Sequence, residues 1–208
     1  RDAHIPALNA LQDTFEIVAI YSRDVSSRSA AEAARLVPGE VTVTDDLAGL
    51  LAQDDIDAVD VVWPIPRLAE GVERALEAGK HVISEKPAAS SVAEGRRLLG
   101  YHAARLDVVW MVAENWRYEP AFRQAASLIA DGAIGRLLTL DWIGHTAMAA
   151  QNPYYGTLWR RENAFMGGFL LDGGVHHIAM LRMIAGEVAS VSAASAQHRP
   201  GPPRGRGR

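Results

Sequence analysis

Short, almost continuously apolar segments alternate with longer segments of mixed polarity up to residue 113. The short segments are rich in β-branched residues, which indicates strands that are buried on both faces of a sheet. The longer segments place apolar residues three or four positions apart, which indicates helices with one apolar face. Strands are predicted for residues 15–21, 41–43, 56–63, 81–84 and 107–113. Helices are predicted for residues 4–12, 26–37, 47–51, 67–78 and 91–104.

This alternation predicts right-handed βαβ units and a doubly wound parallel sheet of the dinucleotide-binding (Rossmann) type. The sequence contains no G-x-G-x-x-G turn, and no strand precedes the first helix. In the strand order 3-2-1-4-5-6, the missing strand lies between the strands predicted for residues 15–21 and 56–63. We therefore expect an incomplete sheet in an α/β chain, and we expect residues 1–208 alone to be a weak enzyme or none.

The pattern changes after residue 119. A helix is predicted for residues 121–129, a strand for 137–143, a long loop for 146–168, a helix for 170–185 and a strand for 188–196. These elements indicate an α+β domain with an open sheet that is cut short. We expect a dinucleotide-binding domain at residues 1–118, a substrate and oligomerisation domain at 119–197, and a disordered tail at 198–208. The Arg, Gly and Pro repeats of this tail suggest out-of-frame or intron-derived coding.

Composition excludes several classes of partner and site. The net charge of −4 favours neither nucleic acid nor an acidic membrane as a partner. The chain has no cysteine, which excludes disulfides, thiolate zinc sites and cysteine nucleophiles. No apolar run approaches the roughly 20 residues that span a bilayer, and no signal-peptide pattern is present. We expect a cytoplasmic protein.

Candidate chemistry begins at Glu85-Lys86-Pro87, directly after a predicted strand. Open α/β sheets bind ligands at the carboxyl ends of their strands. When a hydroxyl carbon is oxidised, the protein must supply a base and a charge that stabilises the developing alkoxide. Lys86 can fill either role. The alternative is an ion pair between Lys86 and Glu85.

A second candidate is the pair Asp172 and His176, which are four residues apart and therefore share one face of the predicted helix. An acid beside an imidazole fixes its tautomer and raises its basicity. The alternative is a helix-capping aspartate and a core histidine. No third ligand follows at a recognisable spacing, so no metal is expected.

Three ordered motifs carry a family resemblance: residues 75–87 around the Glu-Lys-Pro, residues 115–118 (NWRY) and residues 167–177 (GGFLLDGGVHH). Together they resemble the glucose–fructose oxidoreductase / inositol dehydrogenase (Gfo/Idh/MocA) family over about residues 1–197. The Trp159-Arg160 pair and the Gly-Gly-Val-His-His motif are most similar to the sequences of its fungal members.

The resemblance implies hydride transfer between NAD(P) and a sugar, a polyol or a related hydroxyl or carbonyl compound. It implies catalytic roles for Lys86, Asp172 and His176. The second acid often found three residues after the histidine is Ala179 here. Cofactor contacts are expected from Ser22, Arg23, Pro64, Ile65, Glu85, Lys86, Asn115 and Arg117, and substrate contacts from Tyr118, Trp159, Arg160 and His176. A family-like homo-oligomer is left open, because the second sheet is cut short.

The end of the strand at residues 15–21 bears on the choice of cofactor. Sites that prefer NAD place an acid there for the ribose hydroxyls. Here the positions are Ser22 and Arg23, which suit the 2′-phosphate of NADP, although Asp24 follows. The leading hypothesis is an NADP-dependent oxidoreductase, with NAD as the other candidate cofactor. The alternatives are a non-catalytic member that senses a nucleotide or sugar, and an inactive truncated gene product.

Overall fold

The computed structural model describes residues 3–146, 151, 152, 154, 157, 160 and 165–196. The chain divides into two compact units. Unit 1 comprises Arg1–Asn115 and Gly144–His176, and unit 2 comprises Trp116–Ile143 and His177–Arg208. The first boundary lies close to the expected one at residue 118, but residues 144–176 group with unit 1. The predicted tail at 198–208 lies outside the described residues.

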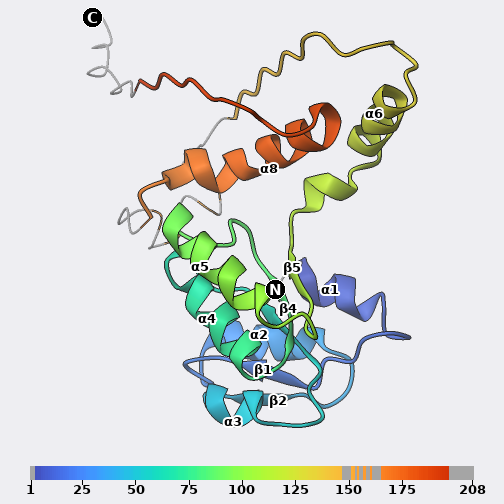
Figure 1. Cartoon of the computed structure of the whole chain (residues 1–208). Coiled ribbons are helices and arrows are strands. Elements are labelled where there is room, and N and C mark those ends of the chain that lie inside the picture. Colours follow the sequence, from blue (N-terminus) through green and yellow to red (C-terminus); the bar gives the residue numbers. More distant parts are fainter. Residues whose placement is uncertain are drawn as a thin grey trace, which may run out of the picture. The chain divides into compact units, whose positions relative to one another are not determined.

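Unit 1 alternates strands and helices as predicted (Figure 1). Its strands are β1 (Ala19–Tyr21), β2 (Thr42–Thr44), β3 (Ala58–Val61), β4 (His81–Ser84) and β5 (Trp110–Val112). Its helices are α1 (His4–Asn9), α2 (Arg28–Leu36), α3 (Leu47–Leu51), α4 (Ile65–Glu77) and α5 (Val92–Ala103). Most of the strands are shorter than the apolar runs that predicted them.

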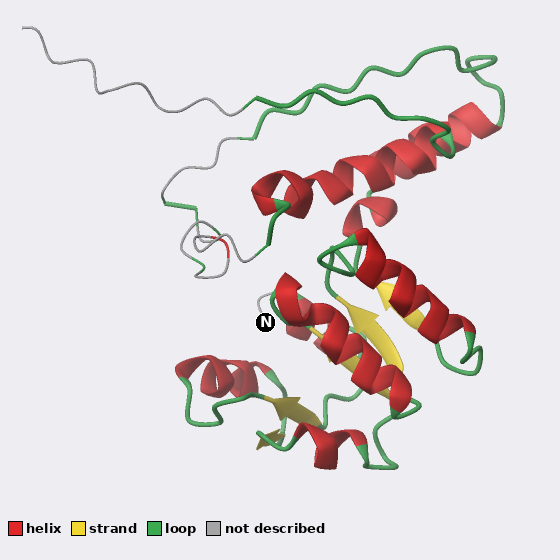
Figure 2. Ribbon diagram, turned by 60° about the vertical axis from the view of Figure 1, so that its left-hand side comes forward, coloured by secondary structure: helices red, strands yellow, loops and turns green. Residues whose placement is uncertain are grey.

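The strands form two parallel sheets, β1–β2 and β3–β4–β5 (Figure 2). Among the described strands, β1 and β3 share no hydrogen-bond ladder. This arrangement matches the doubly wound order with its first strand left out, because that strand would lie between β1 and β3. The prediction of an incomplete parallel sheet is therefore confirmed.

The core of unit 1 forms around α4, which packs on β3, β4 and α5. Leu68, Val72 and Leu76 lie on one face of α4 because they are four residues apart, and all three are fully buried. Val82 of β4 and Leu98 of α5 complete this layer. The helix is followed by Gly79, whose φ of 71° suits a glycine at a helix C-terminus.

Side chains cap the starts of α3 and α5. The Asp46 carboxylate accepts the Gly49 N–H at 2.8 Å and caps α3. The Ser91 hydroxyl accepts the Glu94 N–H at 3.2 Å at the start of α5. The Glu94 carboxylate accepts the N–H of Ser90 at 2.8 Å, one residue before the position that a standard capping box uses.

Unit 2 contains α6 (Pro120–Ala130) and the second half of α8 (Gly168–Ala185). A 3₁₀ turn at Asn115–Tyr118 crosses the first boundary between the units. Aromatic rings gather around His177, whose Nδ1 accepts the Trp142 indole N–H at 2.9 Å. The Trp116 ring meets the His177 ring edge-on at 4.7 Å. No helix among the described residues is long and apolar enough to cross a membrane.

Two predicted strands of the second sheet, residues 137–143 and 188–196, are wrong: the structure has neither as a strand. A strand exists only where a neighbouring strand satisfies its backbone groups, and no described segment pairs with either one. Their apolar side chains also stay in solvent, with Leu138 75%, Ile143 80% and Val191 82% exposed. Local sequence pattern could not supply the missing partners.

Gly71 allows α4 to lie against β3. A methyl group at this position would meet a Val61 methyl at 2.8 Å and the Trp63 ring at 3.0 Å. We expect Gly71→Ala to lower the free energy of unfolding by about 1–3 kcal/mol, because the overlap outweighs the better helix propensity of alanine. The matched control is Gly100→Ala on the exposed side of α5, where nothing lies within 4 Å. This control should stabilise by about 0.5–1 kcal/mol. Urea unfolding measures both, and equal effects would contradict the packing argument.

Candidate active site

The register of the three-stranded sheet brings its charged residues to one edge. Val61 pairs with Ser84, and Ser84 pairs with Val112, so β3, β4 and β5 end at the same level. Glu85 and Lys86 follow β4 directly, and Glu114 follows β5. The Ala113 N–H donates to the Ser84 carbonyl at 2.8 Å, which extends the ladder to this edge. These side chains therefore leave the sheet side by side.

Lys86 binds Asp172, the residue one turn before His176 on α8. The Lys86 ammonium donates to Asp172 Oδ1 at 2.9 Å and to the Asp172 carbonyl at 2.8 Å. Arg160 donates to the other carboxylate oxygen, Oδ2, at 2.8 Å. Asp172 is buried at 7% exposure, so both cations offset the cost of burying its charge. The ammonium thus pairs with Asp172 and not with the adjacent Glu85.

His176 binds a carboxylate that the sequence reasoning did not assign to the site. Its Nδ1 lies 2.6 Å from Oε1 of Glu114, and Glu114 is buried at 7% exposure. The two residues are 62 positions apart in the chain. The signal that could have found Glu114 is its place just after β5, at the same sheet edge as Lys86.

Glu85 belongs to a second charged cluster, in which His4 bridges two carboxylates. His4 Nδ1 lies 2.8 Å from Asp60 Oδ2, and its Nε2 lies 2.9 Å from Glu85 Oε1. The other Glu85 oxygen accepts the Lys86 N–H at 2.9 Å. Asp60 Oδ1 is buried and has no hydrogen-bond partner among the described residues.

This bridge shifts the protonation of its members. Hydrogen bonds to Asp60 and then Glu85 raise the pKa of His4 from 6.5 to about 9, against the opposing effect of burial. Burial pushes the pKa of Glu85 upward, but the hydrogen bonds from His4 and from the Lys86 N–H outweigh it and hold the pKa below its usual value. His4 is therefore an imidazolium at neutral pH, and Glu85 is a carboxylate.

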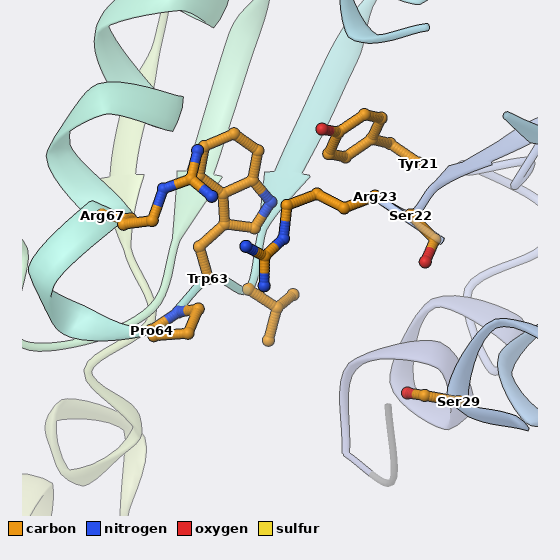
Figure 3. A pocket seen from close by; sticks show the side chains of 8 residues that line it. Tyr21, Ser22, Arg23, Ser29, Trp63, Pro64 and Arg67 are labelled. Atoms are coloured by element: carbon orange, nitrogen blue, oxygen red, sulfur yellow. The ribbon is translucent and has the colours of Figure 1, made fainter. Parts of the chain in front are cut away.

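A pocket of about 290 Å³ lies where β1 and β3 end (Figure 3). Arg23, after β1, and Arg67, on α4, reach it from opposite sides, with the Trp63 ring between Arg67 and Tyr21. Its lining residues are Tyr21, Ser22, Arg23, Ser29, Val62, Trp63, Pro64 and Arg67.

Asp24, the acid that complicated the cofactor prediction, does not line this pocket. Its Oδ1 accepts the N–H of Ser26 at 2.9 Å and the Ser26 hydroxyl at 2.6 Å. The hydroxyl bond and then the N–H bond lower the pKa of Asp24. The carboxylate is thus engaged in its own turn.

The remaining predicted residues do not gather at the site within unit 1. Ile65 is buried in the core at 3% exposure, so its side chain is not available to a ligand. Asn115 is exposed at the end of unit 1. Arg117 and Tyr118 are exposed residues of unit 2, and Trp159 lies outside the described residues. Roles for these residues in binding cofactor or substrate stay predictions.

Comparison with known families gives two adjoining matches. The model of an oxidoreductase family with an NAD-binding Rossmann fold, GFO_IDH_MocA, matches residues 1–114. The model of a GFO/IDH/MocA C-terminal domain matches residues 122–206.

Individual relatives agree with these matches. An uncharacterized protein of Saccharomyces cerevisiae is 33% identical over 199 residues, which cover 96% of this chain and 56% of the relative. The structure of levoglucosan dehydrogenase with NADH and levoglucosan is 33% identical, with a TM-score of 0.73 over 89% of this chain and 50% of that one. A 3-ketoreductase of Actinomadura kijaniata with NADP is 34% identical, with a TM-score of 0.53 over 63% and 40%. The chain spans about half the length of these relatives or less.

The His4 bridge predicts a specific pH dependence of stability. The pKa of His4 is higher in the folded state, so its contribution is fully present below about pH 6.5 and is lost as the pH rises through about 9. We expect wild type to exceed His4→Gln by at most roughly 3 kcal/mol in free energy of unfolding near pH 6. The difference should shrink by about pH 10. Urea unfolding across this range measures it, and the exposed His145→Gln is the matched control. A difference that does not change with pH would contradict the charged bridge.

Proposed function

This chain belongs to the Gfo/Idh/MocA family of oxidoreductases, and we propose that the protein carrying it oxidises a sugar or polyol hydroxyl, or reduces the matching carbonyl, with a nicotinamide cofactor. The observation that supports this most is the convergence of Lys86, Asp172 and His176. Lys86 comes from the end of β4, and Asp172 and His176 come from one face of α8. The levoglucosan dehydrogenase and 3-ketoreductase relatives act on compounds of this class.

Lys86 and His176 have different roles in this reaction. A bound nicotinamide ring supplies the hydride acceptor when the hydroxyl carbon is oxidised. The hydroxyl proton then passes to the ring of His176, which acts as the general base. Lys86 has three N–H donors and uses two of them on Asp172. Its third donor is suited to the substrate oxygen, where the ammonium stabilises the developing negative charge.

Asp172 and Arg160 hold Lys86 in place. With one carboxylate oxygen on Lys86 and the other on Arg160, the Asp172 side chain cannot rotate without losing an ion pair. The Arg160 guanidinium also lies over the Tyr154 ring at 5.0 Å. We therefore assign Arg160 first to the support of Asp172. Its predicted contact with substrate, like those of Tyr118 and Trp159, remains a proposal.

The 290 Å³ pocket fits the adenosine end of a dinucleotide phosphate. Two guanidinium groups and the Ser29 hydroxyl match a phosphate, and the Trp63 ring offers an apolar face for a base. Asp24 is engaged by Ser26, and the described residues that line the pocket include no carboxylate to repel a 2′-phosphate. These observations support NADP over NAD as the cofactor.

Substitution of Lys86 or His176 should lower turnover without weakening cofactor binding. In the natural protein that carries this sequence, we expect Lys86→Ala and His176→Ala each to lower turnover by about 100-fold or more. The Kd for the cofactor should change little. The control is His145→Ala, an exposed histidine of the same unit. Turnover is followed by cofactor absorbance on a substrate found by screening. Wild-type turnover in both variants would refute the catalytic assignment.

Substitution of Arg23 tests whether the pocket binds the 2′-phosphate of NADPH. We expect Arg23→Ala to weaken NADPH binding by about 10- to 100-fold, since it removes a charge-assisted contact worth about 1.5–3 kcal/mol. Binding of NADH should change much less, because it lacks the 2′-phosphate. The control is Arg35→Ala, an exposed arginine of α2 outside the pocket. Fluorescence titration with both cofactors gives the four Kd values. Equal weakening of NADH and NADPH binding, or tighter NADH binding in wild type, would overturn the preference for NADP.

A further inference from the structure

The carboxylate that contacts His176 does not come from α8, the helix that carries His176. Asp172 lies one turn earlier on α8, but its two carboxylate oxygens accept from Lys86 and Arg160. Three positions after His176 the chain carries Ala179, which has no acid to offer. The carboxylate at the imidazole comes instead from Glu114, at the end of β5, with Oε1 2.6 Å from Nδ1.

Glu114 is held firmly enough to orient a partner. Its own N–H donates to the Val112 carbonyl at 2.7 Å, and the preceding residue, Ala113, donates to Ser84 of β4 at 2.8 Å. Its side chain is 10% exposed, and that of His176 is 18% exposed. A buried carboxylate on the end of a paired strand has little freedom, so the imidazole must align with it.

The chemistry of the contact fixes where the ring hydrogen lies. An ionised carboxylate can only accept a hydrogen bond, so the nitrogen facing Glu114 must carry the hydrogen. That nitrogen is Nδ1, which leaves Nε2 of the neutral ring with its lone pair. When the substrate hydroxyl gives its proton to Nε2, Nδ1 keeps its hydrogen and the imidazolium gains a carboxylate partner.

We propose that Glu114 is a positioning residue that holds His176 in the Nδ1–H tautomer and so presents Nε2 to the substrate oxygen. The proposal rests on the proposed function, because it assigns the proton transfer to His176. It assigns to Glu114, which follows β5, a role that neither Asp172 nor Ala179 fills.

The balance of charge agrees with this role. The cations Lys86 and Arg160 both pair with Asp172, whereas Glu114 pairs with His176. A positive charge on His176 during turnover therefore lies beside the Glu114 carboxylate, at 2.6 Å. Removing only the charge of Glu114 should therefore impair proton transfer more than substrate binding.

The first test reads the tautomer directly and needs neither cofactor nor substrate. The natural protein that carries this sequence is labelled with ¹⁵N-histidine, and His176 is assigned by its loss in His176→Asn. At a pH where the ring is neutral, long-range ¹H–¹⁵N spectra distinguish a bare ring nitrogen from a protonated one. We expect Nδ1–H in wild type and a shift toward Nε2–H in Glu114→Gln. An Nε2–H ring in wild type would overturn the proposal, whether or not any variant folds.

The second test is kinetic. We expect Glu114→Gln to lower kcat by about 10- to 100-fold, as removal of a carboxylate behind a functional histidine does. KM should stay within about threefold, because the interaction that is lost acts in the transition state and not in substrate binding. Glu114→Asp should recover part of kcat, because it keeps the charge. The matched control is Glu119→Gln, five positions on, an exposed glutamate whose side chain makes no cap bond to α6.

The outcomes separate this proposal from the proposed function. If Lys86→Ala abolishes turnover and Glu114→Gln leaves kcat at the wild-type value, the function stands and the role of Glu114 is refuted. If the spectra show Nδ1–H but no NADPH-linked turnover responds to Lys86→Ala or His176→Ala, the proposed function fails while the Glu114 contact is real. An equal loss in Glu114→Gln and Glu119→Gln would also refute a specific role for Glu114.

Discussion

The ion pair between Lys86 and Asp172 is the contact on which the site depends. It joins two residues 86 positions apart, one at the end of β4 and one on α8. The ammonium also binds the Asp172 carbonyl, so it fixes the helix backbone as well as the carboxylate. Once this turn of α8 is fixed, His176 follows one turn later on the same face. Removing one member of such a buried pair leaves the other unpaired, which costs about 3–5 kcal/mol. The same contact therefore sets both the geometry of the site and part of its stability.

Two charged clusters meet at Glu85 and Lys86, the two residues that follow β4. Glu85 binds His4, which also binds Asp60, and Lys86 binds Asp172. Because His4 is an imidazolium, the charge of Glu85 is compensated without drawing on Lys86. The lysine ammonium then pairs with Asp172. In this arrangement α1, the first helix of the chain, contributes to the electrostatics of the site although it supplies no catalytic group.

Sequence pattern was sufficient for features that depend on near neighbours. The apolar periods located α1–α5 and β1–β5 of unit 1. Lys86, Asp172 and His176 could be proposed because each stands in a local motif. Glu114 and His4 could not, because their roles arise from partners 62 and 81 positions away. The strands predicted for residues 137–143 and 188–196 failed for the related reason that a strand is defined by its neighbour.

The 290 Å³ pocket depends on how the two sheets of unit 1 are held together. Half of its lining residues come from β1, the turn after it and α2, and the other half follow β3 and extend into α4. No ladder joins β1 to β3 among the described strands, so side chains carry the connection, including the Tyr21 and Trp63 rings at 5.8 Å. A ligand that binds both halves, with Arg23 on one side and Arg67 on the other, adds a link where the backbone provides none. Ligand binding and docking of the two sheets are then thermodynamically linked, since a ligand that binds only the docked arrangement stabilises it.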